Sequence, residues 1–205
     1  MRILAIPSSS YVFGMENMIL AFLEGLAPEV TCHCLLTRWS DGAFARRLDA
    51  LGIPYTTSWL GTLSRQFTWQ ALSWTADCLR RLPTLYADYL SLVRRFRPDA
   101  IYLSSYKQIQ LLWPLLCALP IPVLCHMADP PPDIPFQRRS FALWNRAVDH
   151  YIVISESVRE RLARLGTTPE RMSLLYPGID LKRFPLEPTR NAHFLTQFGW
   201  PDNAL

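Results

Sequence analysis

Glycine and lysine are both scarce in this chain of 205 residues. There are 8 glycines against 17 prolines, and Lys107 and Lys182 are the only lysines among 21 basic residues. Charged residues make up 19% of the chain, below the usual share of about 25%, whereas hydrophobic residues reach 50%. This balance excludes collagen-like and disordered chains and indicates a buried core. The excess of arginine fits either anion recognition by guanidinium groups or a composition habit of the source genome.

The five cysteines are an odd number and follow neither a disulfide framework nor the spacing of zinc ligands. In the strand-like run around Cys32-His33-Cys34, alternation places both thiols on one face and the imidazole on the other. Core packing is therefore favoured over metal binding, and the chain has no Asp-x-Asp pair. We expect a reduced, cytoplasmic protein that needs no metal.

Long uninterrupted apolar runs are also missing. Prolines break the longest uncharged apolar stretch, 111–125, which falls short of the ~20 residues that span a bilayer. The apolar run near the N-terminus is too short for a signal-peptide core, so we expect no membrane-spanning segment. Segment 62–97 holds six arginines against two aspartates and thus carries the whole net charge of +4. Such a local basic face is unlike a nucleic-acid footprint, and we expect no nucleic acid as partner.

Short apolar strands alternate with segments of helical spacing along the chain. Strands are expected at 2–6, 30–36, 53–57, 100–105, 121–127, 150–154 and 172–176. Helices are expected at 15–26, 42–52, 66–96 with a kink or break at Pro83, 107–119, 136–148 and 155–166. This order predicts an α/β doubly wound, mainly parallel, Rossmann-like sheet of about seven strands. Ligands of such sheets bind at the loops after the strands, here 7–15, 104–107, 126–135 and 155–157. Neither G-x-G-x-x-G nor G-x-x-x-x-G-K is present.

The segment 150–188 combines a strand ending at Ser155, a basic helix, another strand, and a Gly178-Ile179-Asp180 turn followed by Phe184-Pro185. This combination resembles the end of the N-terminal, acceptor-side domain in family 4-type glycosyltransferases of the GT-B fold. Segments 13–17, 51–55, 97–106 and 122–129 fit the same pattern in order. The resemblance implies such a domain at 1–188, with 189–205 beginning the linker to a C-terminal donor-binding domain that is missing here.

The resemblance also suggests two residues for the donor side of the site. Gly14 is implied as a phosphate contact at the start of the first helix, although Phe13 replaces the first of the family's two glycines there. The alternative is a plain turn into the helix. His126 stands at the end of a strand where these enzymes keep a histidine beside the donor sugar, so a catalytic role competes with a structural one. Glu16 is interpreted as a helix-start carboxylate rather than a catalytic acid.

Acceptor contacts are implied for Tyr106 and Lys107, and for Arg138 and Arg139 if the acceptor is anionic. The competing interpretation makes all four ordinary surface residues. Ser155 is expected to cap the helix that follows it. Because parallel strands place their following loops on one side, we expect His126, Gly14 and Tyr106 to converge on one cleft.

The function implied is the acceptor half of a retaining, metal-independent transferase. It would move a hexose from a nucleotide-sugar to a sugar, lipid or polyisoprenoid-type acceptor, with no cofactor besides this co-substrate. Without the donor domain the chain should be inactive by itself. The alternative is a non-catalytic binding or partner domain of the same fold. Segment 62–97, with Phe67, Trp69, Leu72 and Trp74, further suggests peripheral docking on an anionic membrane surface, unless these side chains pack in the core.

Overall fold

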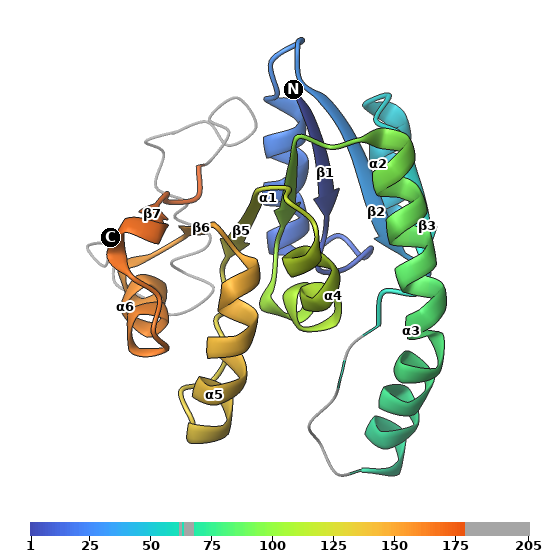
Figure 1. The fold of residues 1–205 in the computed structure, drawn as a ribbon. Helices are drawn as coiled ribbons and strands as arrows, with labels where there is room; N and C mark the ends of the chain where they lie inside the picture. Colours follow the sequence, from blue (N-terminus) through green and yellow to red (C-terminus); the bar gives the residue numbers. More distant parts are fainter. Residues whose placement is uncertain (62, 64–67, 179–205) are drawn as a thin grey trace, which may run out of the picture.

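Seven parallel strands form one sheet in the computed structural model, which describes residues 1–61, 63 and 68–178 (Figure 1). The order across the sheet is β3-β2-β1-β4-β5-β6-β7, and every neighbouring pair is parallel. The strands are β1 (Arg2–Ile6), β2 (Thr31–Thr37), β3 (Tyr55–Ser58), β4 (Ala100–Leu103), β5 (Val123–Met127), β6 (His150–Val153) and β7 (Met172–Leu174). The predicted doubly wound fold is confirmed.

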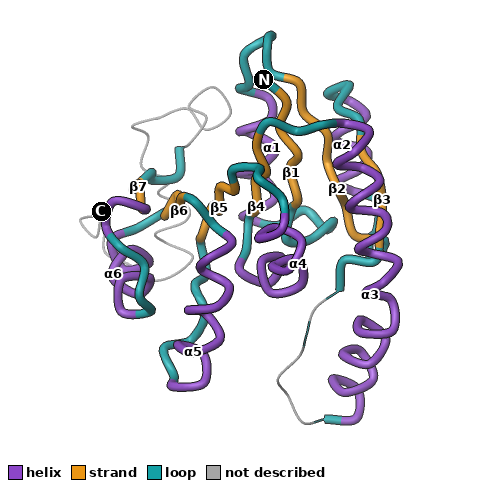
Figure 2. Tube along the Cα trace, in the orientation of Figure 1, coloured by secondary structure: helices purple, strands orange, loops and turns teal. Residues whose placement is uncertain are grey.

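Helices cover both faces of this sheet (Figure 2). They are α1 (Gly14–Glu24), α2 (Ala43–Ala50), α3 (Trp69–Phe96), α4 (Tyr106–Ala118), α5 (Pro135–Trp144) and α6 (Glu156–Arg164), with short 3-10 turns at Asn145–Ala147 and Pro169–Arg171. One core cluster contains the buried side chains of α1 and α2, and the other contains those of α3 to α6. Each face of the sheet therefore has its own apolar core.

The chain changes direction between β1 and β4, the two central neighbours. From β1 it runs outward through β2 to β3, and α3 then carries it back to β4, from which it continues toward β7. Loops that follow β1 and β4 consequently leave the sheet in opposite directions. A crevice outside the carboxyl ends of the strands at this point is where open parallel sheets bind ligands.

Helix α3 has no break at Pro83, one of the two alternatives expected from the sequence. It continues through the proline as one helix of 28 residues, so the predicted break does not occur. Its second half buries Leu85, Tyr89 and Leu92 against the sheet, while its first half extends beyond the carboxyl ends of the strands (Figure 1). Burial on the far side of Pro83 holds the helix together across the proline.

Two other local expectations are confirmed. Cys32 and Cys34 are buried against α1 and α2, whereas His33 lies on the other face, bonded to the Thr56 hydroxyl at 2.9 Å. The hydroxyl of Ser155 caps α6 by accepting a hydrogen bond from the Val158 amide at 3.3 Å.

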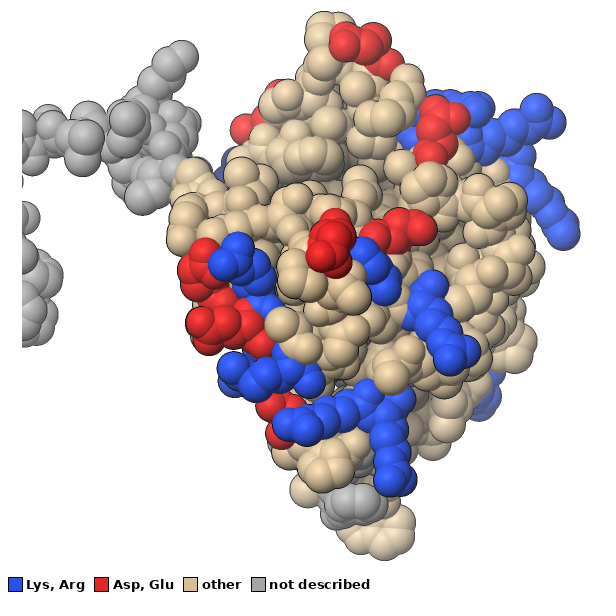
Figure 3. Space-filling view, turned by 60° about the vertical axis from the view of Figure 1, so that its left-hand side comes forward, with Lys and Arg blue, Asp and Glu red and all other residues tan. Residues whose placement is uncertain are grey.

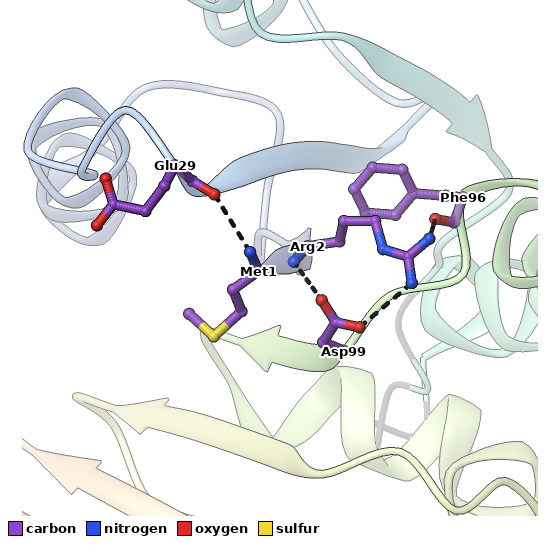
Figure 4. Close-up of polar contacts among 5 residues, drawn as sticks. All are labelled: Met1, Arg2, Glu29, Phe96 and Asp99. Atoms are coloured by element: carbon purple, nitrogen blue, oxygen red, sulfur yellow. Dashed lines mark hydrogen bonds and ion pairs between the residues drawn. The ribbon is translucent and has the colours of Figure 1, made fainter.

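The amino-terminal edge of the sheet is fastened by Arg2 (Figure 4). The Arg2 amide donates to Asp99 Oδ2 at 2.7 Å, and its guanidinium donates to Asp99 Oδ1 and to the Phe96 carbonyl, both at 3.3 Å. The N-terminal ammonium donates to the Glu29 carbonyl at 3.2 Å. These contacts tie β1 to the end of α3 and hold the pKa of Asp99 below its usual range, chiefly through the Arg2 amide. This edge is opposite the one where a ligand would bind.

None of the helices among the described residues is both long and apolar enough to cross a membrane.

Candidate functional site at the carboxyl edge of the sheet

A cavity of about 830 Å³ opens at the carboxyl ends of the central and outer strands. Its walls come from the loops after β1, β2 and β3, the start of α4 and the first half of α3, and Pro132 of the loop after β5 contributes too. The volume lies within the usual range of about 300–1,000 Å³ for small-molecule sites. Its position coincides with the change of direction between β1 and β4.

The inner end of the cavity is polar and carries a cation. Ser8 and Ser9 reach it from the loop after β1, and Tyr106 and Lys107 from the first turn of α4. The Ser8 hydroxyl donates to Glu16 at 2.7 Å, and Ser9 Oγ accepts the Tyr11 amide at 3.0 Å, which leaves the Ser9 proton able to donate elsewhere. The inner end therefore offers a hydroxyl donor and an ammonium group.

The outer end of the cavity is aromatic and apolar. Trp59 packs edge-on against Trp39 with ring centroids 5.7 Å apart, and the Arg81 guanidinium lies 3.6 Å from the centre of the Trp59 ring. Leu60, Trp74 and Cys78 line the same end. Aromatic rings beside aliphatic side chains provide a large contact surface for an apolar ligand group.

Asp77 also borders the outer end, but both of its carboxylate oxygens are engaged. Oδ1 accepts from Arg80 and Oδ2 from Arg81, each at 2.8 Å. These hydrogen bonds lower the pKa of Asp77, so the carboxylate stays ionised at neutral pH. Asp77 therefore forms ion pairs within α3 and is not a free carboxylate for catalysis.

His126 is packed in the core and does not line the cavity. Alternation along β5 turns its ring to the α1 face, where Nδ1 lies 2.7 Å from the Tyr102 hydroxyl and Tyr102 stacks on Phe22 of α1. Burial lowers the pKa of His126, so the ring is neutral at pH 7. Nε2 is buried and has no hydrogen-bond partner among the described residues. One ring nitrogen is thus fixed and the other is unsatisfied.

Gly14 begins α1 but is also outside the cavity lining. It is exposed, and a β-carbon added there would meet nothing within 4 Å. The side chain of Phe13 is 65% exposed, and its amide donates to Glu16 Oε2 at 3.3 Å. Glu16 is therefore the helix-start carboxylate expected from the sequence.

Arg138 and Arg139 lie on the exposed side of α5, away from the cavity lining. Arg138 Nε bonds Asp133 at 2.6 Å, and Arg164 of α6 approaches the same carboxylate at 3.6 Å. Figure 3 shows acidic and basic side chains beside one another on the face drawn there. Arg138 thus neutralises a neighbouring carboxylate, which agrees with the surface-residue interpretation.

The structure brings together only part of the predicted site. Tyr106 and Lys107 border one cavity, whereas His126 is buried outside its lining and Gly14 is exposed at the start of α1. The expectation that His126, Gly14 and Tyr106 share one cleft is not met in this cavity, because strand alternation turns the imidazole toward the α1 core.

Two tryptophans of the cavity, Trp39 and Trp59, were not predicted from the sequence. Trp39 and Trp59 come directly after β2 and β3, at the same edge of the sheet as the loops that were considered. Their place just beyond a strand end was the signal that could have identified them.

Trp69, Leu72 and Trp74 on α3 are 89%, 45% and 58% exposed, so core packing is excluded for these three. Arg65 and Phe67 lie outside the described residues.

No group of three or more His, Cys, Asp or Glu side chains suited to a metal ion occurs within the described ranges. The predicted boundary at 188/189 and the residues Ile179, Asp180, Phe184 and Pro185 fall outside those ranges.

Comparison with solved structures finds the same fold in several other proteins. HepE from Anabaena in complex with UDP has a TM-score of 0.66 and 17% identity over 97% of this chain and 50% of its own. The lipopolysaccharide outer core galactosyltransferase WaaB has a TM-score of 0.58 and 16% identity, over 88% of this chain and 47% of its own. MurG from Acinetobacter baumannii has a TM-score of 0.54 and 14% identity, over 85% of this chain and 44% of its own. The chain spans about half the length of these structures.

Comparison with curated protein sequences finds no match. The sequence profile of Glycosyltransferase Family 4, in contrast, matches residues 12–183, which include six of the seven strands and all six α-helices described above. The chain therefore belongs to Glycosyltransferase Family 4, with the fold of the N-terminal half of a GT-B enzyme.

Proposed function

We propose that the chain is the acceptor-side half of a retaining, metal-independent glycosyltransferase, which moves a hexose from a nucleotide-sugar to a sugar, lipid or polyisoprenoid-type acceptor. The observation that carries this proposal is the cavity at the change of direction between β1 and β4, in a chain that belongs to a glycosyltransferase family. The HepE structures in complex with UDP and with UDP-glucose support a nucleotide-sugar as donor. In this proposal Tyr106 and Lys107 contact the acceptor, and a C-terminal domain holds the donor.

His126 is proposed to contact the donor sugar. Burial raises the pKa of Tyr102, so its hydroxyl keeps its proton and can donate it to His126 Nδ1. The His126 proton then resides on Nε2, which has no partner in the described part of the chain. Because Nε2 is buried, this contact requires that donor binding exposes it, after which the neutral imidazole presents one oriented N–H to a sugar hydroxyl. Gly14, at the start of α1, is proposed as a contact for donor phosphate.

The test is a transfer assay with a radiolabelled UDP-hexose and a panel of acceptors. The chain is compared with a longer polypeptide that includes the coding sequence immediately downstream. We expect transfer by the longer polypeptide and none by the 205 residues alone, since fixing both reactants contributes roughly 7–11 kcal/mol. His126→Ala should lower kcat about a hundredfold, while His33→Ala, a strand histidine remote from the cavity, should not.

A longer polypeptide that binds acceptor but transfers nothing from any nucleotide-sugar would favour the alternative, a non-catalytic binding domain. Transfer by the 205 residues alone would contradict the proposed division of the site between two domains.

We also propose that the protein is cytoplasmic and docks at the membrane through 62–97. The exposed Trp69, Leu72 and Trp74 on a helix that also carries arginines support this. Co-sedimentation should be stronger with liposomes containing phosphatidylglycerol than with pure phosphatidylcholine, and equal binding to both would contradict the proposal.

A further inference from the structure

The cavity changes in character from the centre of the sheet to its edge. Its inner end, at β1 and β4, is formed by serines, Tyr106 and Lys107. Its outer end, at β3, is formed by Trp59, Leu60 and the first half of α3. The strand order places these two ends on opposite sides of β2. Thr37, the last residue of β2, and Trp39 beyond it line the cavity between the two ends. A ligand that fills the cavity is therefore elongated, with one polar and one apolar end.

The inner end suits an anionic group. Lys107 is exposed and forms no ion pair within the described part of the chain, although it borders the cavity. Ser9 retains a donor hydroxyl there, and Glu16, the nearby carboxylate of α1, is occupied by the Ser8 hydroxyl and the Phe13 amide. An ammonium group beside hydroxyl donors recognises phosphate as a point charge with additional hydrogen bonds.

The outer end suits a hydrocarbon chain better than a sugar. A sugar ring on an aromatic platform also needs polar partners for its hydroxyls, and the candidates here are already engaged: Asp77 binds two arginines, and Arg81 is held by Asp77 and lies over Trp59. Trp74 belongs both to this wall and to the exposed apolar face of α3. The outer end thus leads to a surface on which a longer chain continues.

We propose that the cavity binds an anionic amphiphile. Its phosphate-type headgroup lies at Lys107 and Ser9, and its hydrocarbon chain packs against the side chains of Trp59 and Trp74. The inference rests on the proposed function, in which this molecule is the acceptor, and it selects the lipid class among the acceptors considered. Trp74, Trp59 and Lys107 are ligand contacts in this proposal, and Trp39, whose ring packs edge-on against Trp59, lines the cavity between its two ends.

The experiment is titration calorimetry with n-dodecyl phosphate below its critical micelle concentration, on the full chain without a nucleotide-sugar. Three control ligands separate the parts of this molecule. n-Dodecyl maltoside has the same hydrocarbon chain with a neutral headgroup, inorganic phosphate represents the headgroup alone, and maltoheptaose is a sugar without a hydrocarbon chain. We expect dodecyl phosphate to bind and each of the other three to bind at least about tenfold more weakly.

Two pairs of variants assign the ends of the ligand. Trp74→Ala should weaken dodecyl phosphate binding about tenfold, whereas Leu79→Ala, an exposed apolar position on the same helix outside the cavity lining, should leave it unchanged. Lys107→Gln should weaken dodecyl phosphate about tenfold and dodecyl maltoside little, and Arg47→Gln on α2 should affect neither. Circular dichroism and thermal unfolding establish that each variant is folded.

The proposal would be overturned if Trp74→Ala and Leu79→Ala lowered the affinity for dodecyl phosphate equally. Equal affinity of the unchanged protein for dodecyl phosphate and dodecyl maltoside would also overturn it. Preference for maltoheptaose would overturn it in favour of a sugar acceptor. These outcomes are separate from the transfer assay. Amphiphile binding without transfer by the longer polypeptide refutes the proposed function alone, whereas transfer to a soluble sugar without amphiphile binding refutes this inference alone.

Discussion

The hydrogen bond between Tyr102 and His126 gives a quantitative test of the buried polar pair. Tyr102 is 2% and His126 6% exposed, and the Tyr102 hydroxyl lies 2.7 Å from Nδ1. Tyr102→Phe removes this bond without changing the ring that stacks on Phe22. The net loss of a hydrogen bond is about 1 kcal/mol, and a buried nitrogen left without a partner adds about 1 kcal/mol or more. We expect the free energy of unfolding to fall by about 2 kcal/mol.

Tyr151→Phe is the matched control. Tyr151 is fully buried at 0% exposure, but its hydroxyl has no hydrogen-bond partner among the described residues. Removing that hydroxyl should leave stability unchanged or raise it, because an unsatisfied polar atom is lost from the core. Urea denaturation followed by circular dichroism measures both variants, with the slope m unchanged. About 2 kcal/mol corresponds to a fall in Tm of about 4–8 °C for a domain of this size. Equal effects of the two substitutions would refute the reasoning.

Two further predictions concern the cavity wall and the opposite edge of the sheet. A β-carbon at Gly61 would lie 2.7 Å from Cys78 Sγ, so Gly61→Ala should destabilise by about 1–3 kcal/mol in chemical denaturation. In a Cys78→Ala background the same substitution should lower the free energy of unfolding by less, because the clashing sulfur is gone. Strict additivity of the two losses in stability would contradict the clash. Asp99→Asn should destabilise at neutral pH, because the Arg2 amide and guanidinium hold the pKa of Asp99 below its ordinary value. That stability is present above about pH 4 and is lost as pH falls through the folded pKa, so the two unfolding curves should converge in acid. A constant difference between them from pH 7 to pH 2 would contradict this.

The fold was largely predictable because its signals are local and repeated. Alternation of short apolar strands with helices is sufficient for a parallel sheet, and the positions of Cys32, Cys34 and Ser155 follow from strand alternation and helix capping. The path of α3 through Pro83 was not predictable by such rules. A proline inside a helix costs about 3 kcal/mol locally, and the burial of Leu85 and Tyr89 that offsets this cost is tertiary.

The site was less predictable than the fold. Tyr106 and Lys107 were expected near a ligand and do border the cavity. The three tryptophans that line it come from three separate segments, and only the packing of α3 beside β3 brings Trp59 and Trp74 to one wall. Alternation along β5 turns His126 to the α1 face, but the Tyr102 hydroxyl that holds its ring comes from the neighbouring strand β4, and no local pattern specifies that partner.

Helix α3 performs two tasks that are separated along its length. Most of its deeply buried side chains, among them Leu85 and Tyr89, follow Pro83, whereas Trp74 and Asp77, in its first half, form cavity wall. Substitutions before the proline can therefore alter what the cavity accepts while the core keeps its packing. The division makes residues 69–80, apart from the buried Ala71 and Cys78, the natural target for randomised libraries in a search for altered selectivity.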